Sequence, residues 1–464
     1  MGRSAMPTYL TGHLAPVPDE IDAVDLPVAG TLPPELSGRY IRNGPNPLPG
    51  EDRGHWFGGQ GMLHGVRLEG GRAAWYRNRW VRTGMLEGRP PVHPDGGRDL
   101  TATSANTHVV GHGGRLLALA QTGLPYEITP DLDTLGPCDF GGRLTTAMTA
   151  HPKRDPVTGE LHFYGGGARP PYVTYHRLDS AGRLVHSRAI DVPAGTMMHD
   201  FAITEHYVIW LDLPVTFRAG LLGRSFIPYA WDDDYGARLG VMRRDRPDDP
   251  VRRLDVEPCW VFHIGNAHED GSGRVVLDAA RYTDADFGAV WQAVGGSAFG
   301  PAGPAVAAAT AGAARLHRWT LDPVAGTVTE GPLDDRAIEF PTLDDDRVGR
   351  PNRFLYAVAD TTPESVLGAT VVKYDTAGGP ASSHHLGPDI VAGEAVFVPA
   401  AGERRREDDG WLLSIATRRD GSASQLLVID ASAVTAGPVA TVDLPRGVPA
   451  GFHGTWIPDD DTSA

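Results

Sequence analysis

Short apolar runs bounded by turn residues dominate this 464-residue chain. They have the length of strands and are rich in Val, Ile, Leu, Tyr and Trp, which favours β-structure over helix. The clearest runs cover residues 114–123, 159–167, 206–214, 273–284, 352–360, 368–379, 410–421 and 424–432. The 58 glycines and 39 prolines suit the many turns that such strands need. The sequence therefore predicts an all-β fold.

A looser repeat indicates how the strands are organised. A strand runs into an Asp, then a turn, then another strand, in residues 174–191, 316–335, 371–387 and 426–445. Such units cannot cover their own faces, and a closed ring of them removes exposed strand edges. We predict one β-propeller domain over residues 1–464, with residues 1–37 as an extended N-terminal arm. A pair of β-sandwich domains is the alternative, although no Ser/Gly/Pro-rich linker separates two halves.

The charge balance limits the partners of the chain. Its 42 Lys and Arg residues against 58 Asp and Glu residues give a net charge of −16. This argues against a nucleic-acid partner and against a mainly electrostatic hold on anionic lipid. Cys138 and Cys259 cannot form a disulfide framework, and the first twenty residues contain no apolar run of signal-peptide length. We expect a cytoplasmic protein.

Residues 287–314 form a segment without charge. It is long enough to span a membrane, but it contains no Leu or Ile and is interrupted by Pro301, Pro304 and several glycines. We expect a flexible or surface-lying insertion rich in Ala, Gly and Pro. Transient contact with a membrane surface, and hence a peripheral location, is left open.

Four of the 18 histidines lie beside apolar or aromatic residues: His151, His199, His263 and His453. Their separations are too wide for a local metal-binding motif, but they suit a ring whose blades each send one imidazole to the axis. Any one of these residues, taken alone, could be an ordinary core histidine. Four buried imidazoles together would leave several ring nitrogens without hydrogen-bond partners unless a metal ion bound them. Four imidazoles would close a structural zinc site or leave two positions free on Fe(II), and the ligands alone do not decide between the two.

Several segments resemble one known family. They are GRYIRNGPNP (38–47), HWFGGQGMLHG (55–65), SANTHVV (104–110), FHIGNAHED (262–270), GEAVFVP (393–399) and GFHGTWIP (451–458). Together with the contexts of the four histidines, they make the chain similar to the carotenoid cleavage oxygenases, a family that includes retinoid isomerases and stilbene-cleaving dioxygenases. The resemblance implies a seven-bladed propeller with a dome of loops and helix over the metal-bearing face. It also implies one Fe²⁺ held by His151, His199, His263 and His453, with O₂ as co-substrate.

The resemblance further implies glutamates that accept hydrogen bonds from the ligands. Glu339 and Glu394 match two of them and would orient His263 and His453. At the third position the chain has Gln121, whose amide oxygen could accept a hydrogen bond from His199 but brings no charge. We hypothesise a weaker hold on His199 and a raised iron reduction potential. A second departure is Gln60, where the family commonly has Asp, and here we expect altered hydrogen bonding in the loop.

The implied reaction is cleavage of a C=C double bond in a carotenoid or apocarotenoid, giving two carbonyl products. No catalytic residue is expected beyond the metal site, because the chain lacks nucleophile and phosphate-binding motifs. The substrate would be an apolar polyene or stilbene-like molecule held in a tunnel. The candidates for its wall are Phe57, Phe201, Phe262, Tyr229 and Trp231.

Two alternatives stay open from the sequence. One is a stilbene-type dioxygenase, although Ala120 stands where stilbene-cleaving members that the chain resembles place a lysine to bind a phenolic hydroxyl. The other is a non-catalytic propeller that binds partners and has only a structural metal.

Overall fold

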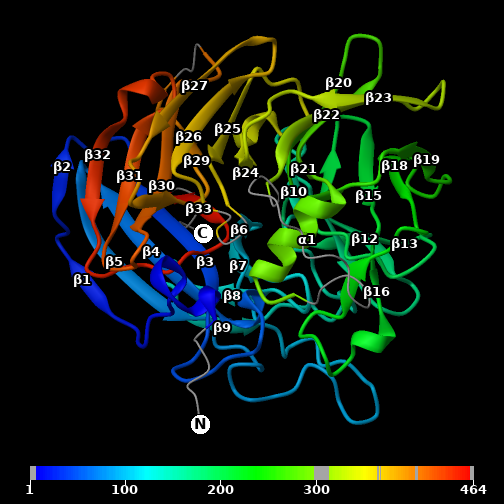
Figure 1. Cartoon of the computed structure of the whole chain (residues 1–464), viewed down its shortest axis with the longest axis horizontal. Coiled ribbons are helices and arrows are strands. Elements are labelled where there is room, and N and C mark those ends of the chain that lie inside the picture. The colour runs from blue at the N-terminus through cyan, green and yellow to red at the C-terminus, as the bar shows by residue number, and fades with distance from the viewer. Residues whose placement is uncertain (1–6, 297–312, 363–364, 366, 403–405, 460–464) are drawn as a thin grey trace.

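The strands of the chain form seven antiparallel blades around a ring (Figure 1). The computed structural model describes residues 7–296, 313–362, 365, 367–402 and 406–459. The prediction of a seven-bladed β-propeller is confirmed, and the pair of β-sandwiches is excluded. One α-helix occurs within the described residues.

The strands of each blade follow one another from the axis outward, and the seven blades follow one another around the ring. Blade 1 consists of β33 (Gly454–Pro458), β3 (Gly38–Asn46), β4 (Gln60–Glu69), β5 (Arg72–Trp80) and β1 (Asp22–Val24). Blade 2 consists of β6 (His108–His112), β7 (Arg115–Leu119), β8 (Tyr126–Ile128) and β9 (Thr134–Pro137). Blade 3 consists of β10 (Lys153–Arg154), β11 (Leu161–Gly166), β12 (Val173–Leu178) and β13 (Leu184–Ile190).

The ring continues in the same way. Blade 4 consists of β14 (Phe201–Ile203), β15 (Tyr207–Asp212), β18 (Ala237–Arg243) and β19 (Arg252–Val256). Blade 5 consists of β20 (Trp260–Glu269), β21 (Val275–Tyr282), β22 (Arg315–Asp322) and β23 (Thr327–Pro332). Blade 6 consists of β24 (Ile338–Thr342), β25 (Phe354–Ala359), β26 (Thr370–Asp375) and β27 (Gly379–His385). Blade 7 consists of β28 (Ile390–Ala392) and β29 (Val396–Pro399), both paired to β30 (Gly410–Arg418), then β31 (Ser424–Asp430), β32 (Pro438–Asp443) and β2 (Val28–Gly30).

Strands from both ends of the chain close the ring. The C-terminal strand β33 pairs with β3 and becomes the inner strand of blade 1, while the N-terminal strand β2 pairs with β32 at the outside of blade 7. Figure 1 shows the blue N-terminal strands beside the red C-terminal ones. Because unfolding at either end would expose strand edges, this double exchange joins the first and last blades into one cooperative unit.

The strand–Asp–turn repeat corresponds to one position in the blade. Asp179, Asp322, Asp375 and Asp430 each stand at the end of the third strand, before the turn to the fourth. In each case the side-chain oxygen accepts a hydrogen bond from a backbone N–H two residues further on. An Asp carboxylate at this place closes the turn locally, which explains why the pattern recurs.

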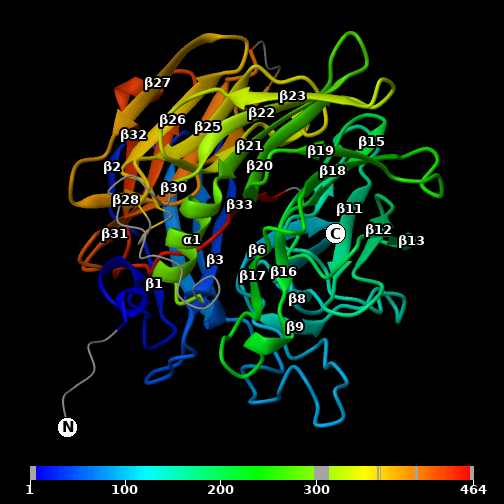
Figure 2. The ribbon, with the colours of Figure 1, turned by 45° about the vertical axis from the view of Figure 1, so that its right-hand side comes forward.

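Several elements that lie outside the blades gather on one face of the ring. They are the helix α1 (Asp284–Ala293), the small sheet of β16 (Val215–Phe217) and β17 (Tyr229–Trp231), and short 3₁₀ turns such as Trp56–Gly58. In Figures 1 and 2, α1 lies in front of the strands near the middle of the ring. None of the described helices is long and apolar enough to cross a membrane.

The first part of the uncharged segment 287–314 belongs to helix α1, so the prediction of a flexible or surface-lying insertion is wrong for this part. Thr283 caps the helix by accepting a hydrogen bond from the Asp286 N–H, and residues 287–293 are helical. Phe287 and Trp291 are fully buried, so this part belongs to the core and does not lie loose on the surface. The sequence was misleading because Gly and Ala obscure the helical spacing of these two aromatic residues. Residues 297–312 of the segment lie outside the described residues.

Candidate metal centre

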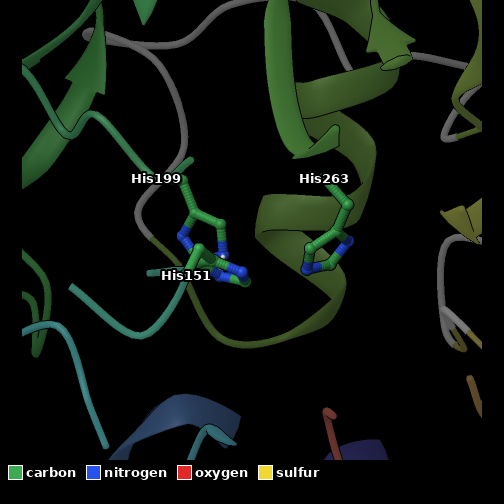
Figure 3. Close-up of side chains that lie close together, drawn as sticks. All are labelled: His151, His199 and His263. Atoms are coloured by element: carbon green, nitrogen blue, oxygen red, sulfur yellow. Dashed lines mark hydrogen bonds between the residues drawn. The ribbon is translucent and has the colours of Figure 1, made fainter. Parts of the chain in front are cut away.

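The four singled-out histidines all lie at inner strands of the ring. His151 and His199 precede β10 and β14 by two residues, His263 lies within β20, and His453 directly precedes β33. They therefore come from blades 3, 4, 5 and 1. Because the inner strands line the axis, residues far apart in the sequence meet there. Figure 3 shows His151 and His199 close together, with His263 facing them from another element.

The imidazoles converge closely enough to share an ion. Nε2 of His151 lies 3.0 Å from Nε2 of His199, and one ring nitrogen from each of His151, His199 and His263 lies within 4.8 Å of the others. The ring centroid of His453 is 4.7 Å from that of His151 and 4.8 Å from that of His263. Nε2 of His453 is buried and has no hydrogen-bond partner within the described residues. A metal ion would provide a partner for this nitrogen. The four histidines are therefore suited to holding a metal ion.

Burial keeps two of the ligands neutral. It lowers the pKa of His151 and of His199 well below the usual value, and the nearby histidines lower both further. A neutral imidazole has a free lone pair on one nitrogen, which is the form that binds a metal. These two histidines are therefore ready to bind a cation at neutral pH, whereas burial of His263 is outweighed by the neighbouring Glu339, which raises the pKa of that imidazole.

Two glutamates, Glu339 buried and Glu394 largely buried, accept hydrogen bonds from the other two histidines. Oε2 of Glu339 lies 2.5 Å from Nδ1 of His263, and Oε1 of Glu394 lies 3.0 Å from Nδ1 of His453. Burial raises the pKa of each carboxyl, but the charge of its histidine and the hydrogen bonds that it accepts outweigh this, so both pKa values are lowered. Each carboxylate fixes the Nδ1 proton of its histidine, which turns Nε2 toward the axis.

Gln121 makes a different contact from the one expected. Its amide N–H donates to the main-chain carbonyl of Met198, the residue before His199, and also lies 3.3 Å from the hydroxyl of Tyr164. Among the described residues no hydrogen bond joins Gln121 to the imidazole of His199. The Met198 carbonyl accepts a hydrogen bond from the hydroxyl of Tyr164 as well. An amide can donate a second one to it, whereas a carboxylate cannot.

An aromatic wall lies beside the histidines. Phe262 and Phe452 each directly precede a metal-site histidine, and the ring of Phe57 lies 6.5 Å from the first and 5.2 Å from the second. Phe262 also contacts His199, at 5.2 Å between centroids. Sequence analysis did not single out Phe452, although the position directly before a ligand, which it shares with Phe262, is a usable signal.

The other three residues predicted for the tunnel wall lie in two different apolar clusters. Tyr229 and Trp231 lie on β17 and pack against the same apolar cluster as Phe262. Phe201 does not: it stacks on Trp210 and contacts Tyr164 in a separate cluster between blades 3 and 4. Its position two residues after His199 suggested the axis, but the alternation of the strand turns its side chain between the blades.

One further histidine lies near the axis. His108, which sequence analysis did not single out, lies on β6, with its ring centroid 5.0 Å from that of His453 and its Nδ1 3.0 Å from the carbonyl of Ala150. Burial lowers its pKa to about 3, so it too is neutral. Gln60, the first residue of β4, is buried, and neither of its amide atoms has a hydrogen-bond partner within the described residues.

The site defines a class of protein. A propeller whose axis presents converging imidazoles, two of them held by carboxylates, beside an aromatic wall has the features of a metal-dependent enzyme for apolar molecules. Comparisons with known proteins specify this class further.

The family model described as retinal pigment epithelial membrane protein matches residues 14–458. A carotenoid cleavage oxygenase of Mycobacterium tuberculosis is 40% identical, over 97% of both chains. Among solved structures, cobalt-substituted apocarotenoid oxygenase of Synechocystis has a TM-score of 0.81 at 28% identity, covering 97% of this chain and 98% of that one. Lignostilbene dioxygenase of Pseudomonas brassicacearum has a TM-score of 0.85 at 28% identity, covering 99% and 100%.

This chain belongs to the carotenoid cleavage oxygenase family. It is therefore an oxidoreductase, and the alternative of a non-catalytic scaffold is wrong.

Proposed function

We propose that the chain cleaves a C=C double bond of a carotenoid or apocarotenoid with O₂, and that its cofactor is one Fe²⁺ per chain. One alkene and one O₂ give two carbonyl products, so both oxygen atoms are accounted for. The observation that carries the proposal is the buried, partnerless Nε2 of His453 beside the three-histidine group. His151, His199, His263 and His453 would hold the ion, and Fe²⁺ would supply the activation of O₂.

The protein's own residues position the reactants. Glu339 and Glu394 hold the protons of His263 and His453 at Nδ1, which keeps both Nε2 atoms free for the ion. Phe57, Phe262 and Phe452 offer a flat apolar surface next to the histidines, on which a conjugated chain could lie. No general acid or base is needed, because the reaction transfers no proton.

The lysines of the chain favour a polyene over a phenolic stilbene. Ala120 is buried and cannot bind a phenol. The chain has only two lysines, and both are in ion pairs: Lys153 with Asp200 at 2.8 Å and Lys373 with Asp408 at 2.6 Å. Neither is available to hold a phenolate. The similarity to lignostilbene dioxygenase nevertheless makes a hydroxystilbene the right competitor in a test.

The test is O₂ uptake by protein purified without air and loaded with Fe²⁺. An apocarotenal should consume one O₂ per molecule and yield two carbonyl fragments, whereas a hydroxystilbene should react more slowly. The matched control is His453→Ala, which removes the proposed fourth ligand. Faster reaction with the stilbene would overturn the substrate assignment, and iron-independent cleavage would overturn the cofactor.

A further inference from the structure

One buried carboxylate contacts all three chain segments that carry the three-histidine group. Asp200 directly follows His199, and its side chain is 2% exposed. Its Oδ1 accepts a hydrogen bond from the N–H of Phe201 at 2.8 Å and lies 2.8 Å from Nζ of Lys153. Its Oδ2 accepts a hydrogen bond from the N–H of Ile264 at 2.9 Å.

These partners stand next to the other two histidines. Lys153 follows His151 by two residues in blade 3, and Ile264 directly follows His263 in blade 5. Asp200 itself lies in blade 4 beside His199. One side chain therefore ties together three neighbouring blades at the level of the imidazoles.

The strands themselves do little to fix these three histidines. His151 and His199 precede the paired residues of β10 and β14. On β20 the register shifts, so that Phe262 and His263 together face Ala280 alone, which makes a bulge at the histidine. The Ile264 N–H at this irregularity is bound by Asp200. The carboxylate thus supplies the order that the strand pairing lacks.

We propose that the Asp200–Lys153 pair positions His151, His199 and His263 at metal-binding distance. Both residues are positioning residues, since they act through the three histidines. The pair is neutral overall, so it orders the ligands without adding net charge beside the ion. A site that is ordered in advance binds its ion more tightly, because less conformational entropy is lost on binding. The inference rests on the proposal that this histidine group binds a metal.

Cobalt(II) provides a test that does not depend on activity. The double variant Asp200→Asn/Lys153→Met keeps the net charge of the wild type but removes the ion pair. In this variant the amide at position 200 has a single oxygen. That oxygen can accept a hydrogen bond from only one of the two backbone N–H groups, those of Phe201 and Ile264. We expect at least about a tenfold loss of Co²⁺ affinity, in the range known for residues that orient metal ligands. We also expect a changed visible absorption band of the bound cobalt, because the ligand geometry is altered.

The matched control is Lys373→Met/Asp408→Asn. It removes the chain's only other lysine and the other buried lysine–carboxylate pair within the described residues, in a charge-neutral way. We expect this control to lower the unfolding temperature but to keep the Co²⁺ affinity and spectrum of the wild type.

Each outcome either supports or overturns the positioning role of the Asp200–Lys153 pair. If the Asp200→Asn/Lys153→Met protein binds Co²⁺ with the wild-type affinity and spectrum, the proposal is overturned. An equal loss in the Lys373→Met/Asp408→Asn control would also overturn it, since general destabilisation would then explain the effect. If the first double variant does not fold, Asp200→Glu replaces it: an unchanged spectrum contradicts the proposal and a shifted one supports it. Wild-type protein that binds no Co²⁺ would instead contradict the proposed metal site.

Discussion

Nδ1 of His263 lies 2.5 Å from Oε2 of Glu339, and the hydroxyl of Tyr282 donates to the other oxygen of the same carboxylate. Glu339 is almost fully buried, so its charge acts on the imidazole with little screening by water. Replacement by Gln keeps the shape but removes the charge that strengthens the ligand. We expect Glu339→Gln to weaken Fe²⁺ or Co²⁺ binding about 10- to 100-fold, measured by competition with a chelator.

The chain offers a matched control for this prediction. Nε2 of His317 lies 3.2 Å from Oε2 of Glu330 on the outer strands of blade 5, away from the three-histidine group. Glu330→Gln therefore also removes a carboxylate from a histidine, but should leave metal affinity unchanged. Equal losses in the two variants would show that Glu339 acts on stability and not on the ligand.

A carboxylate in place of Gln121 should change the electronic properties of the site. Gln121→Glu adds a negative charge near His199 and removes the amide N–H that donates a hydrogen bond to the Met198 carbonyl. We expect the reduction potential of bound iron to fall by tens of millivolts, because one partly screened charge contributes about 1 to 2 kcal/mol. Spectroelectrochemical titration measures this. An unchanged or raised potential would contradict our hypothesis that the neutral amide raises it.

Buried neutral histidines should make the metal-free protein sensitive to acid. Burial lowers the pKa of His55 to about 3, and burial together with nearby arginines lowers the pKa of His64 and of His162 well below the usual value. Below about pH 6.5 the unfolded chain binds protons at these sites while the folded chain does not. The free energy of unfolding should therefore fall as the pH falls from about 7 to about 5, by up to about 1.4 kcal/mol per pH unit for each histidine.

Urea unfolding of chelator-treated protein over this pH range measures the effect. The variant His162→Gln should reduce the slope by about one proton, since it removes one of these sites. Stability that rises toward acid pH would contradict the prediction.

The aromatic wall should affect substrate binding and not metal binding. Phe262→Leu removes a ring that contacts both His199 and Phe57. We expect KM for an apocarotenal to rise about three- to tenfold, the energy of one aromatic contact, with unchanged Co²⁺ affinity. Phe201→Leu is the control, because Phe201 packs between blades and should lower only stability. If Phe201→Leu raised KM and Phe262→Leu did not, the prediction that the aromatic wall around Phe262 contacts the substrate would be contradicted.

Sequence reasoning was most informative where a residue acts through its own chemical type. The strand–Asp–turn repeat could be read directly, because each Asp closes its own turn. The resemblance also led to the pairs His263–Glu339 and His453–Glu394, both of which the structure joins by hydrogen bonds.

Features that depend on three-dimensional packing could not be read in this way. The partner of Gln121 is a main-chain carbonyl, and every residue has one, so no sequence signal identifies it. The direction in which Phe201 points depends on how β14 pairs, and the role of Asp200 depends on a bulge in another blade. Helix α1 was missed because its two buried aromatic residues stand among small ones.

The central claim is that four imidazoles from four blades hold one iron ion. Crystals of protein loaded with Fe²⁺ without air, measured at the iron absorption edge, test it most directly. We predict one anomalous peak per chain on the propeller axis, within bonding distance of a ring nitrogen of His151, His199, His263 and His453. A peak bound by carboxylates instead, or one that leaves His453 unbound, would contradict the account.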